Sequence, residues 1–148
     1  RRQKAEGRKQ KAEGRKRKTR GKTMPILRGH RDLRVYQRAH QLAMDIFAES
    51  KKFPPDERYS LTSQIRRSSR SVAANIAEGF RKRQYPNMFL SKLADSDAEA
   101  TETQVWLDFA HECGYLSFET HKRLINGYEE LGRMLSRMMS DPEKFSPS

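Results

Sequence analysis

The stretch LTSQIRRSSRSVAANIAEG, residues 61–79, decides how this chain folds. Its apolar side chains recur four or seven residues apart, which is the spacing of one face of an α-helix. They are Leu61, Ile65, Val72 and Ile76, and Ser68 and Ser69 fill the middle of the same face. The spacing predicts a helix over about residues 60–78 that packs on its neighbours through a narrow inner face. Gly79 is expected just after this helix, in the left-handed conformation that often ends one.

Upstream of this stretch, a second periodic segment runs over about residues 33–52. Its apolar positions are Val35, Ala39, Leu42, Ala43, Ile46 and Phe47. Asp32 is placed to accept hydrogen bonds from the first free backbone N–H groups, so it is the expected N-cap. Pro54-Pro55 cannot continue a helix, and the segment is therefore predicted to end before them.

Two more helices are expected downstream. Pro86 suits the first turn of one that runs to about Cys113, where Gly114 ends it. Ser117 can cap the last, which Asp141-Pro142 ends. No segment shows sustained alternation of period two, so no sheet is expected.

Four amphipathic helices joined by short links predict an all-α fold, an antiparallel up-down four-helix bundle, over residues 31–141. Small residues would let its helices approach closely: Ala73, Ala74, Ala77, Ala94, Ala98 and Ala100. The C-terminal residues 142–148 are expected to be disordered.

Composition narrows the function class. The chain has 148 residues, of which 34% are hydrophobic and 34% are charged, and it contains one cysteine. That suits one small domain and permits no internal disulfide. No stretch approaches the roughly 20 apolar residues of a membrane span. We therefore expect a cytoplasmic protein without a membrane segment.

The formal net charge of +12 is unevenly placed. Residues 1–23 carry twelve Lys or Arg and two Glu, so nearly all of the excess lies there. These residues repeat as RRQKAEG, RKQKAEG and RKRKTRG within a basic tail, residues 1–30, expected to be disordered. The tail could neutralise phosphates. Alternatively, RRQKAEG can be encoded by the base unit AGAAGGC repeated three times, and Met24 would then be the native start.

The motifs together resemble a known family. They are Asp32-Leu33-x-Val35-Tyr36-Gln37-x-Ala39-His40, Glu57-Arg58-Tyr59-Ser60-Leu61-Thr62-Ser63-Gln64-Ile65-Arg66-Arg67, Ser71-Val72-Ala73-Ala74-Asn75-Ile76-Ala77-Glu78-Gly79, Glu102-Thr103-Gln104-x-Trp106-Leu107 and Gly114-Tyr115-Leu116-Ser117. Over about residues 31–140, the chain resembles the bacterial four-helix-bundle family of proteins encoded in intervening sequences of 23S ribosomal RNA genes. Ala73 departs from the proline that the family often has there.

The resemblance implies an up-down bundle that assembles into a homopentamer and has no enzymatic activity or cofactor. It also implies that Gln64, Arg66, Asn75, Glu78, Gly79, Glu102, Gln104 and Trp106 are family motif positions with structural roles. A related branch comprises accessory subunits of the reverse transcriptases of diversity-generating retroelements. This branch is thought to bind the reverse transcriptase and nucleic acid.

Two basic groups are candidates for nucleic-acid binding. Arg66 and Arg70, four residues apart on one helix, repel each other, so an anion is expected nearby. Either RNA phosphate at Arg67 and Arg70, or carboxylates of another helix or subunit, would supply it. The second group is Arg81-Lys82-Arg83 with Tyr85, which offers phosphate contacts and stacking, or else forms a solvated loop.

The remaining polar residues favour structural roles. Asn75 is expected to hydrogen-bond across the bundle and Glu78 to pair with an arginine, rather than to catalyse. The acids of residues 95–112 lack the Glu-x-x-His pairs of a di-metal bundle. Cys113 with His111 and His121 matches no common zinc spacing.

The sequence therefore predicts a non-enzymatic homo-oligomeric bundle that binds RNA, DNA or a ribonucleoprotein. The alternative is a protein-interaction scaffold, such as an accessory subunit of a reverse transcriptase. Neither requires a cofactor or metal. Trp106 and Phe109 cannot both point inward beside Leu107, so one of them is expected at a subunit contact.

Overall fold

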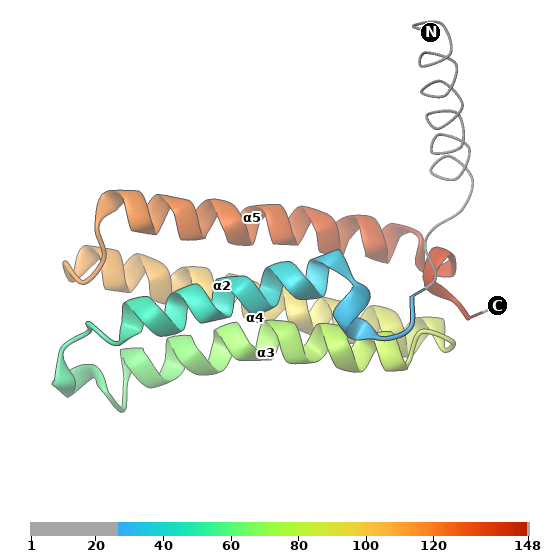
Figure 1. Cartoon of the computed structure of the whole chain (residues 1–148), viewed down its shortest axis with the longest axis horizontal. Helices are drawn as coiled ribbons and strands as arrows, with labels where there is room; N and C mark the ends of the chain where they lie inside the picture. Colours follow the sequence, from blue (N-terminus) through green and yellow to red (C-terminus); the bar gives the residue numbers. More distant parts are fainter. Residues whose placement is uncertain (1–26, 148) are drawn as a thin grey trace, which may run out of the picture.

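The computed structural model describes residues 27–147 and contains four long helices (Figure 1). They are α2 (Arg34–Ser50), α3 (Leu61–Arg81), α4 (Pro86–Glu112) and α5 (Phe118–Ser140). Three short 3₁₀ turns accompany them: η1 (His30–Asp32), η2 (Pro55–Glu57) and η3 (Pro142–Phe145). Residues 27–147 contain no strand, and the predicted all-α bundle is confirmed. The proposals for the basic tail concern residues that lie largely outside the described ones.

Each helix packs against two others. α2 contacts α3 and α5, and α4 contacts the same two, so the four helices surround one core. Short links make successive helices antiparallel, as Figure 1 shows. No helix among residues 27–147 is long and apolar enough to cross a membrane.

Most of the predicted helix ends are correct. Pro86 is the first residue of α4, and Gly114 follows that helix with a φ of 81°, a left-handed angle that glycine adopts at little cost. The Ser117 side chain caps α5 by accepting a hydrogen bond from the Thr120 backbone N–H at 3.1 Å. Pro142 follows the end of α5.

Two predicted caps are wrong. Asp32 lies within η1, where its carboxylate accepts from the Arg28 backbone N–H, and Leu33 is the N-cap of α2. Gly79 lies inside α3 and is buried, since the helix continues to Arg81. A Cβ at Gly79 would stand 3.0 Å from the Lys92 Cβ, so this glycine permits the close approach of α3 and α4.

Small hydroxyl side chains fill the seam between α3 and α4. The Ser96 hydroxyl donates to the Val72 carbonyl at 2.9 Å, and Thr103 Oγ1 lies 2.8 Å from Ser68 Oγ. All three hydroxyl residues have no exposed surface. They let the two helices approach closely without leaving buried donors unpaired.

The alanines divide between core and surface. Ala73 and Ala100 are buried as expected, whereas Ala74, Ala94 and Ala98 are exposed, which contradicts their predicted packing role within the chain. The two exposed alanines of α4 therefore leave a smooth outer surface on that helix.

The ends of the domain extend beyond the predicted limits. Residues 142–148 were expected to be disordered, but Pro142–Phe145 form η3, and the Phe145 ring lies 6.0 Å from the buried Phe89 ring. Leu27 also packs against the core, so the folded part begins before residue 31. Leu27 and Phe145, both partly buried, thus attach the two ends of the domain to its core.

Candidate nucleic-acid interface

Three cations gather around one aromatic ring between α2 and α3. The Lys51 Nζ and the Arg66 Cζ each lie 4.8 Å from the centroid of Phe47, and the Arg70 Cζ lies 5.6 Å from it. Phe47 is in the last turn of α2 and Lys51 directly follows that helix, four residues further on, and the two arginines are one turn apart on α3. We call these four residues the Phe47 cluster.

Carboxylates do not balance the Phe47 cluster. Among residues 27–147, Lys51, Arg66 and Arg70 take part in no ion pair. Arg66 donates from Nε to the Ser50 hydroxyl at 2.7 Å, which fixes the direction of its guanidinium group. The negative face of the ring attracts each cation but carries no net charge. Three like charges held this closely leave a site that an anion would stabilise.

Arg67, the next residue along α3, lies in a different environment. Its Nη2 stands 2.7 Å from Glu102 Oε2 and 3.6 Å from Glu99 Oε1, both on α4. The Trp106 indole N–H donates to the same Glu102 oxygen at 3.1 Å. The carboxylate partner expected for an arginine of this segment is therefore present, and it belongs to Arg67.

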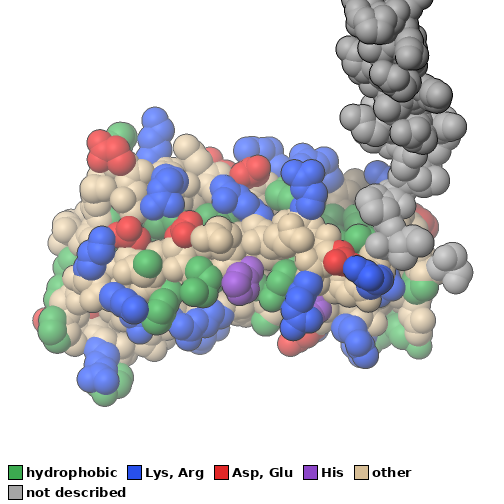
Figure 2. Space-filling view, in the orientation of Figure 1, with side chains coloured by type: hydrophobic (Ala, Val, Ile, Leu, Met, Phe, Trp, Pro, Cys, Tyr) green, Lys and Arg blue, Asp and Glu red, His purple; other side chains and the backbone are tan. Residues whose placement is uncertain are grey.

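Arg66 and Arg70 continue into a longer basic stripe on α3. At about 100° per residue, Arg66, Arg70, Ala74, Ala77 and Arg81 fall within about 80° of one another around the helix. The stripe spans about 22 Å at 1.5 Å per residue, with only alanines between the cations. Figure 2 shows Lys and Arg side chains along the face that carries α2 and α3, with hydrophobic side chains between them.

The basic residues at the end of α3 and in the link to α4 differ in whether the protein already contacts their side chains. Arg81 and Lys82 are exposed, and the Tyr85 ring is 52% exposed. Arg83 instead lies 3.9 Å from the Phe80 ring centroid and donates to the Phe80 carbonyl at 3.0 Å. Arg81, Lys82 and Tyr85 are thus available to a ligand, whereas Arg83 is partly held by the protein.

The polar motif residues of α3 face α4. Glu78 forms an ion pair with Lys92 at 2.8 Å, so its partner is a lysine and not the predicted arginine. This contact raises the pKa of Lys92. Asn75 donates to the Ser71 carbonyl within its own helix, and its side-chain oxygen lies 3.5 Å from the Lys92 Nζ. Both residues therefore hold α3 against α4.

The motif residues near the far end of the same seam border a cavity. A cavity of about 360 Å³ opens between the start of α3 and the end of α4. It is lined by Glu57, Ser60, Leu61, Gln64, Trp106, Phe109 and Cys113. Gln104, partly buried on α4, does not line it. Trp106 is partly buried, whereas Phe109 is 55% exposed, as expected for one residue of that pair.

Hydrogen bonds organise the wall of this cavity at Glu57. The Ser60 hydroxyl donates to Glu57 at 2.7 Å and the Tyr115 hydroxyl at 2.9 Å, and both lower the pKa of Glu57. The hydrogen bond between Tyr115 and Glu57 also raises the pKa of Tyr115 to about 12. The Ser60 bond closes the link before α3 on itself, and the Tyr115 bond ties this link to the turn between α4 and α5.

The residues compared above with zinc spacings lie near the end of α4 and the start of α5: His111, Cys113 and His121. Within residues 27–147, no group of three His, Cys, Asp or Glu residues could hold a metal ion. The His111 and His121 rings stack at 4.4 Å, and His121 Nε2 lies 2.9 Å from Asp108 Oδ1. Cys113 is exposed.

Sequence reasoning missed Phe47 and Lys51. Phe47 stands in the apolar stripe of its helix, which favours a core position, and its role appears only when α3 lies beside it. The signal available in the sequence was the one-turn spacing of Phe47 and Lys51, matched by that of Arg66 and Arg70.

The family model of the 23S rRNA-intervening sequence proteins matches residues 31–137. This chain belongs to that family. A similar solved structure is described as a protein of unknown function from the S23 ribosomal protein family of Bacteroides thetaiotaomicron. It is 26% identical, and the match covers 71% of this chain and 97% of that one, with a TM-score of 0.65. A comparison with curated proteins gave no match.

Membership in the 23S rRNA-intervening sequence family confirms the predicted resemblance and the fold. The matched residues include all of α2, α3 and α4 and the links between them, and therefore the whole Phe47 cluster. They end within α5, before η3.

Proposed function

We propose that this member of the 23S rRNA-intervening sequence family is a non-enzymatic, homo-oligomeric bundle that binds RNA through α3 and the adjoining part of α2. The observation that carries the proposal is the Phe47 cluster, in which three cations surround one ring and none pairs with a carboxylate of the described residues. Phosphate groups of a nucleic-acid backbone supply the charge that this site lacks.

The length of the stripe favours a polymeric anion over a single one. The roughly 22 Å from Arg66 to Arg81 is several times the spacing of the charges of one nucleic-acid strand, about 3.4 Å along the axis of duplex DNA, so several phosphates can face the stripe at once. Arg70 lies between them, and the exposed Arg81 and Lys82 continue to Tyr85, whose half-exposed ring can stack on a base. Arg67 contributes less, because Glu99 and Glu102 already neutralise it.

The outer face of α4 supports self-association. Five exposed residues fall within about 80° around this helix and carry no charge: Ala94, Ala98, Thr101, Val105 and Phe109. Val105 is 43% exposed and Phe109 is 55% exposed. A smooth apolar stripe lets another helix approach closely, and we propose that a second copy covers it in a homopentamer. The subunit number rests on the family resemblance, and light scattering would measure it.

RNA binding is tested by fluorescence anisotropy of a labelled structured RNA across a salt series. The full chain and a chain that begins at Met24 are compared, because residues 1–23 add a strong positive charge. In both, Arg66→Gln with Arg70→Gln should lower the affinity and reduce the salt slope by about two, one for each phosphate contact. Arg133→Gln, which removes an exposed charge from α5, is the matched control.

Two results would count against RNA binding by the folded domain. The first is a Met24 chain that shows no binding while the full chain binds, since all affinity would then belong to the basic repeats. The second is an unchanged salt slope in the Arg66 and Arg70 variant.

The second candidate is a protein-interaction scaffold, such as an accessory subunit of a reverse transcriptase. The cavity between α3 and α4 favours it, because Trp106 and Phe109 form an apolar wall beside the exposed face of α4. Tyr59, on the link before α3, is 85% exposed near the same end. This candidate would be favoured if the chain is monomeric and does not bind RNA, but binds a reverse transcriptase encoded beside its gene.

A further inference from the structure

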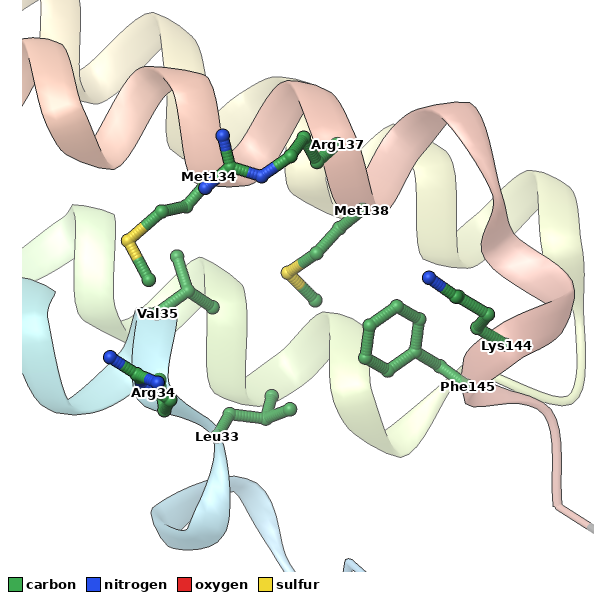
Figure 3. Close-up of a pocket in the computed structure, with 8 residues that line it drawn as sticks. All are labelled: Leu33, Arg34, Val35, Met134, Arg137, Met138, Lys144 and Phe145. Carbon is green, nitrogen blue, oxygen red and sulfur yellow. The ribbon is translucent and has the colours of Figure 1, made fainter. Parts of the chain in front are cut away.

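A groove at the opposite end of the bundle combines an apolar floor with a basic rim. It lies where the start of α2 meets the end of α5 and η3, and its volume is about 260 Å³ (Figure 3). The floor consists of Leu33, Val35, Met134, Met138 and Phe145, and the rim of Arg34, Arg137 and Lys144. We call it the terminal groove.

The rim cations of the terminal groove come from three different elements. Arg34 is the first residue of α2, Arg137 lies near the end of α5, and Lys144 belongs to η3. All three are exposed, and among residues 27–147 none of them forms an ion pair. Figure 3 shows them on different sides of the apolar side chains. Cations on different sides of a groove suit a chain with several carboxylates better than a single small anion.

The floor selects against a nucleic acid. Leu33, Val35 and Met138 are nearly buried, at 5%, 3% and 7% exposed, whereas Met134 and Phe145 are partly exposed and supply most of the apolar surface below the charges. A sugar-phosphate backbone would cover this surface with polar groups and gain little from it. Leu or Phe side chains would fill it, and the flexible thioethers of Met134 and Met138 can adjust to either.

The volume also favours a peptide over a small molecule. Pockets for small molecules usually measure about 300–1,000 Å³ and enclose most of the ligand. The terminal groove is smaller and partly open, which suits one or two side chains of a larger partner. The chain's own N-terminal repeats carry the same charge as the rim, because twelve of residues 1–23 are Lys or Arg.

We propose that the terminal groove binds an acidic peptide segment of another protein, with one or two bulky apolar side chains on the floor and carboxylates at Arg34, Arg137 and Lys144. This recognition couples hydrophobic anchoring with charge pairing. It is independent of RNA binding, because the groove shares no residue with the Phe47 cluster.

The test uses the full chain and two fluorescein-labelled synthetic peptides of equal length and equal negative charge. One contains Leu and Phe among Asp and Glu residues, and the other has Ser in place of Leu and Phe. Both can bind the basic repeats through charge alone. Fluorescence anisotropy should show that the first peptide binds more tightly. The double variant Arg34→Gln with Arg137→Gln should bind this peptide about tenfold more weakly. Arg133→Gln, outside the groove, should leave it unchanged.

Methionine methyl signals report where the peptide binds. In NMR of the chain labelled with ¹³C-methyl methionine, the apolar acidic peptide should shift Met134 and Met138. Met44, ten residues along α2 from the Arg34 rim, should not move. Equal binding of the two peptides, or unchanged affinity in the Arg34 and Arg137 variant, would overturn the proposal. Shifts confined to Met44 would do so too, as would displacement of the peptide by a structured RNA.

Discussion

The two sides of α3 carry the same residue type in opposite electrostatic states. Toward α4, Arg67 has two carboxylates within 3.6 Å, and the neighbouring hydroxyls and Lys92 also have partners. Toward α2, Arg66 and Arg70 stand against Phe47, and neither forms an ion pair with a carboxylate of residues 27–147. One helix thus has a closed side, the seam with α4, and an open side, the Phe47 cluster.

The difference separates charges that stabilise the fold from charges that remain for a ligand. A half-exposed ion pair contributes little to stability, yet it neutralises the cation and weakens its attraction for phosphate. An unpaired cation contributes less to the fold and keeps its full attraction for an anion. Arginines of one helix should therefore divide into those that affect stability and those that affect affinity.

The largest expected effect comes from forcing the closed side apart. Gly79→Val adds a branched side chain where even a Cβ would stand 3.0 Å from the Lys92 Cβ, an atom that cannot move without its backbone. We expect a loss of about 1–3 kcal/mol in the free energy of unfolding, measured by urea denaturation. Gly132→Ala is the control, since among the described residues its Cβ would come within 4 Å only of Asp97 Oδ1, at 3.7 Å. It should stabilise α5 by up to about 1 kcal/mol. Equal losses in both variants would contradict the tight seam.

The next effect compares the two sides directly. Arg70→Gln and Arg67→Gln are the same substitution three residues apart on one helix. Arg70→Gln should weaken RNA binding about tenfold at low salt and leave the melting temperature unchanged. Arg67→Gln should lower the melting temperature slightly and leave RNA binding nearly unchanged, because its charge is already paired. Anisotropy and thermal melts of both variants measure this. Equal effects on affinity would remove the distinction between the two sides.

The sequence predicts the helices of this bundle because apolar spacing and end signals are local. Pro86, Gly114 and Ser117 act through their own backbone or the next turn, so the order of residues is enough to place them. The same reasoning places Gly79 wrongly at a helix end, because the need for a glycine there comes from the neighbouring helix α4 and not from the local sequence. A glycine is needed where Lys92 passes, and this does not show in residues 61–79.

The candidate site was predictable only in part, because it depends on how each helix is rotated. Arg66 and Arg67 differ by about 100° around α3, and the sequence does not say which of them faces α4. Phe47 has the spacing of a core residue, although it stands at the edge where α2 and α3 leave a ring accessible. The terminal groove joins residues 33–35 to residues 134–145, a contact that no local pattern encodes.

A smaller effect distinguishes satisfied hydroxyls from an unsatisfied one. Thr103 Oγ1 on the closed side lies within 2.9 Å of both Ser68 Oγ and the Glu99 carbonyl oxygen. The Tyr128 hydroxyl of α5 is buried and has no hydrogen-bond partner among the described residues. Thr103→Val should therefore cost about 1 kcal/mol, whereas Tyr128→Phe should leave stability unchanged or raise it slightly. Urea denaturation measures the free energy of unfolding of both variants. A clear loss of stability in Tyr128→Phe would show that this hydroxyl has a hydrogen-bond partner.

The smallest effect concerns the stability of the protein in acid, which depends on Glu57. This carboxylate fixes the start of α3 and so helps to position both the closed and the open side of that helix. Hydrogen bonds from Ser60, Tyr115 and the Leu61 N–H lower the pKa of Glu57 below its ordinary value of 4.5. A lowered pKa means that the folded state favours the carboxylate, so these bonds stabilise the protein above about pH 4.5 and are lost as the pH falls below it. Glu57→Gln should thus lower the melting temperature at neutral pH and flatten its decline in acid. Glu129→Gln, an exposed carboxylate in no ion pair among the described residues, should follow the unsubstituted chain throughout. If Glu57→Gln declines in acid as steeply as the unsubstituted chain, the carboxylate does not hold α3, and the two sides of the helix are positioned by the seam alone.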